Sequence, residues 1–321
     1  MNHFSMRRLF GLALMGALAL RGPVADAALT IQFDYTYDDG GFFSGANVGR
    51  RDLLAAAANV FTSRITDSLS AITPDADNTW TPSIFDPRNT SNTLTFSGPA
   101  IAADTVLVFV GASNLGASTL GLGGPGGYGA SGITQSWFDT LQGRGQAGAL
   151  LATPTDYGPW GGTLAFNSTS SWYFDPNPAT VESFTGLNDF FSVAVHELGH
   201  LLGLGTADSW KALEVNPAVS GTSFTGTHSA ALQGGNVPLS ADNGHWAEGA
   251  MSTIAGTLTA QEAAMDPTLT VGTRKYFTDL DYAGLQDVGW QLSAIPEAAT
   301  LAWAAALGTL GMMLRLRARR H

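Results

Sequence analysis

The sequence predicts an α+β protein in which a mixed sheet and helices precede one chemically distinctive helix and an irregular C-terminal part. A strand is expected at Thr105–Val110, because its continuous apolar run Val106–Val110 is typical of a strand that is buried on both faces of a covered sheet. Apolar residues recur at helical spacing between Asn47 and Leu69, which predicts a packing helix. A further helix is expected over 189–204, because Asp189 can cap its start and Gly205 can end it.

Two other strands are expected, at Thr93–Phe96 and Gly161–Asn167. The second can lie in the core of the sheet or at its edge, and an edge strand would accept an extended peptide by main-chain hydrogen bonds. Residues 111–133 contain nine glycines. No Lys-Ser/Thr pair follows them, so a phosphate-binding loop is disfavoured and a mobile surface loop is expected.

Composition restricts the chemistry. The chain has 321 residues and no cysteine, which excludes disulfides, thiolate metal ligands and a thiol nucleophile, so a site must use nitrogen and oxygen. Seven of the fifteen basic residues lie near the ends, and residues 28–295 retain eight basic against twenty-four acidic residues, a net charge of −16. This acidity argues against a nucleic acid partner and suits an exported, soluble unit.

The N-terminal segment has the order of a secretory signal peptide. Arg7 and Arg8 precede an apolar run at Leu9–Leu20, and the small-residue site Ala25-Asp26-Ala27 follows. Twelve apolar residues are too few to span a bilayer. We therefore expect a signal peptide at 1–27, followed by one unit at 28–295 with an N-terminal part to about 205 and a C-terminal part over 206–295.

The C-terminal segment 296–321 predicts a membrane-sorting tail. Pro296-Glu297 precedes an apolar stretch at Ala298–Leu314, and four arginines follow it. The order resembles the PEP-CTERM tail of Gram-negative bacteria, which an exosortase is thought to process, although Ala298 replaces the second proline; a plain membrane anchor is the alternative. The resemblance implies export to the surface or exterior of a Gram-negative cell, with transient membrane association through this tail.

The chemistry is concentrated in His196-Glu197-Leu198-Gly199-His200. On a helix His196 and His200 differ by about 40° around the axis and stand one turn apart, so both imidazoles can reach one metal. Zinc binds neutral imidazoles and brings the pKa of a bound water to about 7. Glu197 is placed to take the water proton and return it to a leaving amine.

A catalytic zinc takes three protein ligands, so a third must come from elsewhere. His245, in Gly244-His245-Trp246, is the favoured candidate. His228 is a weaker one, and Asp208 or Glu214 would give a carboxylate ligand instead.

The sequence around these residues resembles that of the metzincin metallopeptidases. Gly203 matches the glycine of their extended motif, while Thr206 stands where the third histidine usually lies. In leishmanolysin-like members that histidine follows a long insertion in a Gly-His-Trp setting, which here falls on His245. Met265, followed by Asp266-Pro267, matches the methionine of the Met-turn in preference to Met251.

Residues 278–290 resemble the C-terminal helix of matrixin-type chains. Independently of the resemblance, Thr278 and Asp281 have the spacing of an approximate capping box. Asp279, Asp281 and Asp287 are therefore expected as helix caps and surface residues, not as calcium ligands. Asp75-Ala76-Asp77-Asn78 can form a calcium turn, but a solvated loop is favoured and calcium stays unsupported.

The resemblance implies a zincin fold and a secreted bacterial zinc endopeptidase that acts on proteins or peptides. Zinc would be held by His196, His200 and His245, with Glu197 as general base and acid and Met265 beneath the metal. The alternative is a non-catalytic zinc-binding surface or biofilm-matrix protein on the same scaffold. The intact Glu197 argues against that alternative, since a structural zinc site needs no general base.

Overall fold

The computed structural model describes residues 29–178, 180, 182–216 and 222–294. The predicted signal peptide and sorting tail lie outside these residues. Within the described ranges, none of the helices combines the length and the apolar character needed to cross a bilayer.

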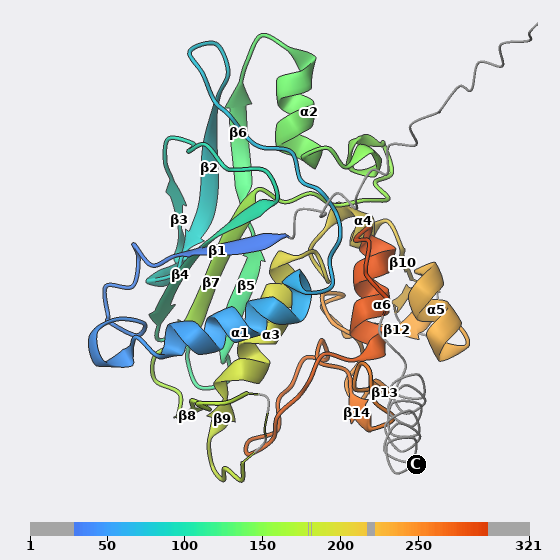
Figure 1. Cartoon of the computed structure of the whole chain (residues 1–321). Helices are drawn as coiled ribbons and strands as arrows, with labels where there is room; N and C mark the ends of the chain where they lie inside the picture. The colour runs from blue at the N-terminus through green and yellow to red at the C-terminus, as the bar shows by residue number, and fades with distance from the viewer. Residues whose placement is uncertain (1–28, 179, 181, 217–221, 295–321) are drawn as a thin grey trace, which may run out of the picture.

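The main sheet has four strands in the order β1 (Thr30–Asp34), β4 (Thr105–Ser113), β7 (Gly161–Asn167) and β5 (Gly121–Pro125). β1, β4 and β7 run parallel, whereas β5 is antiparallel to β7 and forms the edge (Figure 1). The predicted mixed α+β architecture is confirmed.

Both faces of β4 are buried, as its continuous apolar run predicts. Val106, Val108 and Val110 belong to the main core, which also contains buried residues of α1 (Arg50–Thr62) and α3 (Phe190–Leu201). Leu107 and Phe109 point to the opposite face, because side chains alternate along a strand.

A second sheet packs on that opposite face. Its strands are ordered β3 (Asn89–Thr95), β2 (Thr79–Asp86) and β6 (Gly127–Ser131). Trp80 of this sheet, Trp137 of α2 (Gln135–Gly143) and Trp160 before β7 share a cluster with Leu107 and Phe109. The remaining elements before α3 are the short helices η1 (Gly45–Asn47) and η2 (Ala147–Leu150) and the strand pair β8 (Trp172–Tyr173) and β9 (Asn188–Asp189).

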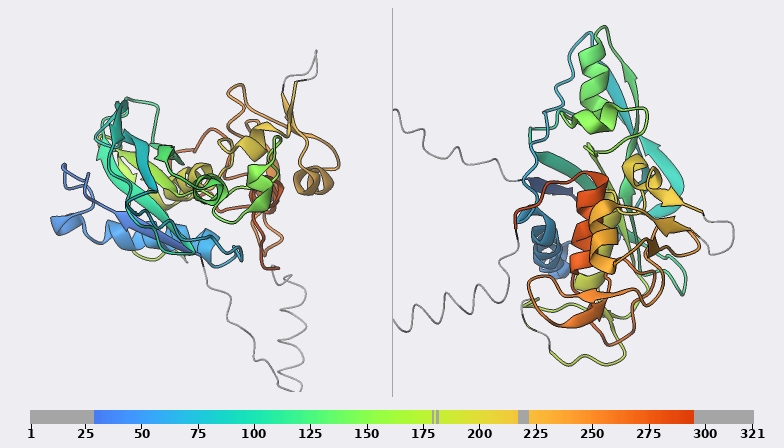
Figure 2. Two further views of the ribbon diagram at one scale, coloured as in Figure 1. Left: turned by 90° about the horizontal axis from the view of Figure 1, so that it is seen from above. Right: turned by 90° about the vertical axis from the view of Figure 1, so that its right-hand side faces the viewer.

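The C-terminal part consists of short elements and one longer helix. In chain order they are α4 (Asp208–Lys211), β10 (Glu214–Val215), β11 (Ser223–Phe224), α5 (Thr227–Gln233), β12 (Val237–Pro238), β13 (Met251–Thr253), β14 (Ala260–Glu262) and α6 (Asp279–Val288). Helices α5 and α6 lie side by side (Figure 2). Trp210 and Phe224 stack on each other, and the ring of Trp246 packs at an angle against both, so these three buried aromatic side chains form part of the core here.

The glycine-rich segment 111–133 is not the expected mobile loop. It forms the end of β4, then β5 and β6, and β5 rather than β7 is the edge of the main sheet. The glycines are required by close packing: a Cβ at Gly123 would lie 2.3 Å from the main-chain oxygen of Glu197, and one at Gly126 would lie 2.1 Å from the Trp160 ring. Glycine has a low β-propensity, so the sequence did not indicate these strands, although their close packing requires glycine at these positions.

Candidate active site

The helix α3 starts at a buried charged network. The Asp189 side chain accepts a hydrogen bond from the Ser192 main-chain N–H at 3.1 Å and caps the helix. Arg274 donates to both oxygens of Asp189 at 2.8 Å, and it also pairs with Asp175 at 2.8 Å. The network therefore ties the start of α3, the helix that carries His196 and His200, to the chain before α6.

The imidazole rings of His196 and His200 on α3 meet the ring of His245. The Nε2 atoms of His196 and His200 are 3.1 Å apart, and the Nε2 of His245 lies 3.2 Å and 3.0 Å from them. Their ligand atoms all lie within 4.8 Å of one another, so the three side chains could hold one metal ion. Sequence reasoning placed them in one site, and the fold brings the third ligand candidate to the other two.

The other ring nitrogens show that the site fits a cation. Each Nδ1 lies beside an acceptor: the Ala264 carbonyl at 2.7 Å for His196, the Leu204 carbonyl at 2.9 Å for His200 and the Asp242 carboxylate at 3.0 Å for His245. An Nδ1–H donating there leaves the Nε2 lone pair free in a neutral ring. Three lone pairs that point at one another repel, so a cation that prefers imidazole, such as zinc, fits between them.

The protonation states also suit a metal. Burial and the neighbouring histidines lower the pKa of His196 well below its usual range. The same causes, burial and the proximity of His245, lower the pKa of His200 to about 4. Both rings are therefore neutral at neutral pH, which is the state that binds zinc.

Glu197 lies beside the histidines, under the edge strand. Its side chain is buried, and burial raises its pKa to about 8 although the Gly123 main-chain N–H opposes the rise. A Cβ at Gly121 would lie 2.6 Å from the Glu197 Oε1 atom. The glycines of β5 thus let an open sheet edge approach the carboxylate.

The other ligand candidates lie outside the cluster. His228 is exposed on α5, Asp208 pairs with Lys211 at 3.0 Å on the surface, and the Glu214 carboxylate accepts from Asn243. Thr206, at the usual position of the third histidine, turns its hydroxyl back to the His200 carbonyl at 2.6 Å.

Met265, the expected methionine of the Met-turn, packs against α3 between the two helical histidines. It is 1% exposed, and a Cβ at Gly199 of α3 would lie 2.5 Å from its sulfur. Met251 is 52% exposed on β13 and does not compete.

Asp281 supports the main chain at Ala264 and Met265, and the sequence predicted only its capping role. The predicted capping box with Thr278 is present, but the expectation of a surface residue is wrong, because the side chain is fully buried. It accepts from the Ala264 N–H at 2.8 Å, the Met265 N–H at 3.1 Å and the Trp246 indole at 3.0 Å. These donors are distant along the chain, so no local pattern could reveal them.

A cleft of about 490 Å³ contains the three histidines and Glu197. The edge strand β5 lines one side, and residues 264–269 line part of the other. Lys275 closes one region of it, with its ammonium between Asp266 at 2.5 Å and Glu262 at 3.0 Å. The lining of this cleft therefore combines the edge strand with the three histidines and Glu197.

Residues 131–222 match the family model of the matrixins. The matched range contains His196, Glu197 and His200 and ends before His245 and Met265. The match supports a zinc metallopeptidase of the metzincin type, and the mixed α+β architecture agrees with the zincin fold of that family. No curated protein matches the chain.

Other acidic groups are engaged in turns and caps. The Asp75 carboxylate accepts from the Asp77 and Asn78 main-chain N–H groups at 2.9 and 2.8 Å, which makes the loop a self-contained turn. Asp287 caps α5 by accepting from the main-chain N–H groups of His228 and Ser229. Neither observation supports a calcium site.

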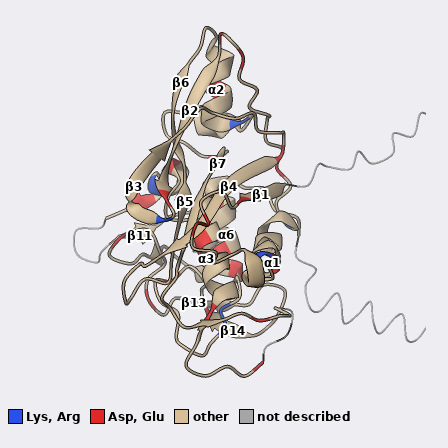
Figure 3. Cartoon of the chain, turned by 90° about the vertical axis from the view of Figure 1, so that its left-hand side faces the viewer, with Lys and Arg blue, Asp and Glu red and all other residues tan. Residues whose placement is uncertain are grey.

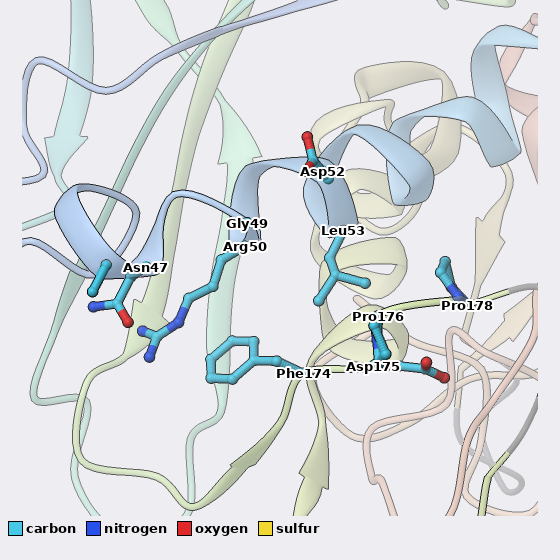
Figure 4. A pocket seen from close by; sticks show the side chains of 10 residues that line it. Asn47, Gly49, Arg50, Asp52, Leu53, Phe174, Asp175, Pro176 and Pro178 are labelled. Carbon is cyan, nitrogen blue, oxygen red and sulfur yellow. The ribbon is translucent and has the colours of Figure 1, made fainter.

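A second pocket, of about 470 Å³, lies beside the first turn of α1 (Figure 4). The Arg50 guanidinium is 4.0 Å from the centre of the Phe174 ring and 4.4 Å from that of Phe42. Asp175 at this pocket is already paired with Arg274. These side chains are occupied by packing and charge pairing, so the pocket has no chemistry comparable to that of the histidine cleft.

Proposed function

We propose that the protein is a zinc-dependent endopeptidase in which His196, His200 and His245 hold the metal. The observation that carries this proposal is the convergence of three Nε2 atoms, 3.0–3.2 Å apart, beside the buried carboxylate of Glu197. Zinc bound there would acidify a water molecule and polarise the carbonyl of the scissile peptide bond.

Glu197 carries the proton. Its ionised form, which a zinc ion held nearby would favour, accepts a proton as water oxygen adds to the peptide carbonyl carbon, and it delivers that proton to the leaving nitrogen as the carbon–nitrogen bond breaks. The products are a carboxylic acid and an amine, and Glu197 returns to its starting state. Burial under β5 keeps bulk water from competing for the proton.

The edge strand β5 orients the substrate. The Asn167 N–H donates to the Leu120 carbonyl, and the Gly126 N–H donates to the Gly161 carbonyl, so even-numbered residues bond to β7. The main-chain groups of Gly121 and Gly123 therefore point away from β7, towards the cleft. The Gly123 N–H meets the Glu197 carboxylate. An extended peptide can pair with the Gly121 groups and the Gly123 carbonyl and place one of its peptide bonds before the histidines.

The test is a cleavage time course on an unfolded protein substrate, with the zinc-loaded full chain beside its Glu197→Ala and Glu197→Gln variants. We expect the parent to cleave and both variants to lose about 100-fold or more in rate while they retain zinc, because only proton transfer is removed. A folded, zinc-loaded parent that cleaves nothing in a broad peptide library would contradict the proposal. That result would favour the non-catalytic surface protein.

The third ligand has its own test. His245→Ala should reduce bound zinc well below one ion per chain, whereas His228→Ala, a matched control on exposed α5, should leave it unchanged. Stoichiometric zinc in His245→Ala would overturn the assignment of His245.

We also propose that the enzyme is exported, with residues 1–27 removed and 296–321 serving as a sorting segment. The order of charged, apolar and small residues at both ends supports this proposal. Mass spectrometry of the mature protein from the native cell tests it, since a retained Met1 would contradict removal of the signal peptide.

A further inference from the structure

We propose that the substrate-binding edge of β5 continues along β6, so that the protein grips a long extended stretch of polypeptide on the N-terminal side of the bond it cleaves. The inference rests on the proposed peptidase function and names its substrate class as unfolded chain with many residues upstream of the scissile bond.

The two strands are one run of chain. β5 (Gly121–Pro125) ends the main sheet, β6 (Gly127–Ser131) ends the second sheet, and only Gly126 lies between them. Their inner partners, β7 and β2, lie on the same side of this run in Figure 1 and contact each other. The run is therefore an edge strand shared by two sheets.

The hydrogen-bonding pattern shows which groups of β6 are free. The Trp80 and Pro82 carbonyls of β2 accept from the Gly98 and Phe96 N–H groups on the β3 side. The alternate residues of β2, Thr81 and Ser83, must then face β6, where their register partners are Gly129 and Gly127.

Tyr128 and Ala130 consequently direct their main-chain groups away from β2, to the open edge. Gly126 bonds to β7 and Gly127 faces β2, so two successive residues face the sheets. This is the signature of a β-bulge, which lets one strand pass between two sheets while its open edge stays on one side.

The open edge is accessible and tolerant of sequence. All five residues of β6 are exposed, and no strand in the described ranges pairs with its other edge. β5 and β6 carry no charged residue and contain five glycines, so they are uniformly tan in Figure 3. Recognition there would use main-chain hydrogen bonds, which any extended chain can supply.

The direction of the chain follows from strand pairing. Antiparallel pairing is slightly more stable per residue than parallel pairing. A substrate that runs against the direction from β5 to β6 has its N-terminal side on β6 and its scissile region at Gly121 and Gly123. At roughly 3.3 Å per residue, the edge from Gly121 to Ala130 spans about 30 Å, which corresponds to about eight upstream residues.

The experiment uses fluorogenic peptides with one cleavable core and about three, six or nine residues added upstream or downstream. We expect kcat/KM of the zinc-loaded full chain to rise about tenfold with upstream extension and to change little with downstream extension, from the added hydrogen bonds. Ala130→Pro removes an outward N–H without breaking the β2 ladder and should abolish most of this rise. Ala130→Val keeps the N–H and should retain it, and all three proteins should cleave the shortest peptide equally.

Binding separates this inference from the peptidase function. Fluorescence anisotropy with the Glu197→Ala variant measures the affinity of labelled peptides without turnover, and the long upstream peptide should bind about tenfold more tightly than the short one. Equal affinities, or a gain only on downstream extension, would overturn the inference while leaving cleavage of short peptides intact. Tight binding of long peptides without any cleavage by the parent would instead contradict the peptidase function alone.

Discussion

His245 is held differently from the two histidines of α3. Main-chain carbonyls accept from His196 and His200, whereas the Asp242 carboxylate, three residues before His245, accepts from the third ring. Burial alone would raise the pKa of Asp242, but hydrogen bonds from Ser240, His245 and Gly244 lower it to about 2. Asp242 therefore stays ionised, and a loop histidine gains the orientation that a helix gives to the other two.

Asp67 is a buried carboxylate whose charge is not compensated. It is 3% exposed, its Oδ1 has no hydrogen-bond partner in the described part of the chain, and its Oδ2 accepts from the Gln291 N–H at 2.7 Å. Burial, with a smaller contribution from the Asp156 charge, raises its pKa to about 6. The folded protein thus binds a proton here that the unfolded chain has already released between about pH 4 and 6.

Stability should fall as pH rises from 4 to 6 because of this group, and Asp67→Asn should remove that loss. An asparagine keeps an acceptor for Gln291 and carries no charge. We expect the variant to be more stable than the parent by about 3 kcal/mol at pH 7.5 and equal to it at pH 3.5, from the shifted pKa. Urea unfolding of both proteins at the two pH values checks this, and a gain of equal size at both would contradict it.

At the scale of elements, the start of α6 secures the site as much as α3 does. Asp281 caps α6 and also accepts from the Met-turn and from Trp246, the neighbour of His245. One buried carboxylate therefore joins the last helix, the chain at Met265 and the loop that carries His245. A substitution of Asp281 should therefore affect the positions of all three segments.

Asp281→Asn should destabilise the protein by about 2–4 kcal/mol, because the amide NH₂ would face N–H donors and leave at least one buried donor unpaired. Zinc affinity should fall with it, since Ala264 and Met265 lose their support. Asp279→Asn, in the same turn of α6 but only partly buried, is the matched control and should cost less than about 1 kcal/mol. Thermal unfolding and competition with a zinc chelator measure both, and similar losses in the two variants would refute the role of Asp281.

At the scale of the whole molecule, the three proposed metal ligands come from two parts of the chain. His196 and His200 lie on α3, and His245 lies in the C-terminal part, 45 residues after His200. A cation bound to all three would link these parts in the folded state only. Zinc should therefore act as a stabilising ligand of the whole fold.

Removal of zinc with a chelator should lower Tm, and excess zinc should restore it. At a free zinc concentration about 1,000 times Kd, the stabilisation is about 4 kcal/mol. The His245→Ala variant, which retains only the two ligands of α3, should show a much smaller difference between the zinc-loaded and zinc-free forms. Calorimetry of both proteins measures this, and an equal shift in the variant would show that His245 does not link the two parts.

Local pattern was sufficient for the elements that obey one periodicity. The sequence indicated the apolar run of β4, the spacing of His196 and His200 on α3 and the capping box at Thr278, because each depends on residues within a few positions of one another. Local pattern failed for β5 and β6. Their glycines look like a loop, and the reason for them is the main chain of Glu197 and the ring of Trp160, which lie far away in sequence.

The sequence by itself thus determined the chemistry: a helix with two imidazoles and a carboxylate, a chain without thiols, and a small set of candidates for the third ligand. Tertiary structure decided which candidate lies beside them, that β5 is the sheet edge lining the cleft, and that Asp281 is buried. The physical reason is that spacing along a helix fixes directions only within a turn or two. Meetings across many residues are decided by the packing of whole elements against a shared core.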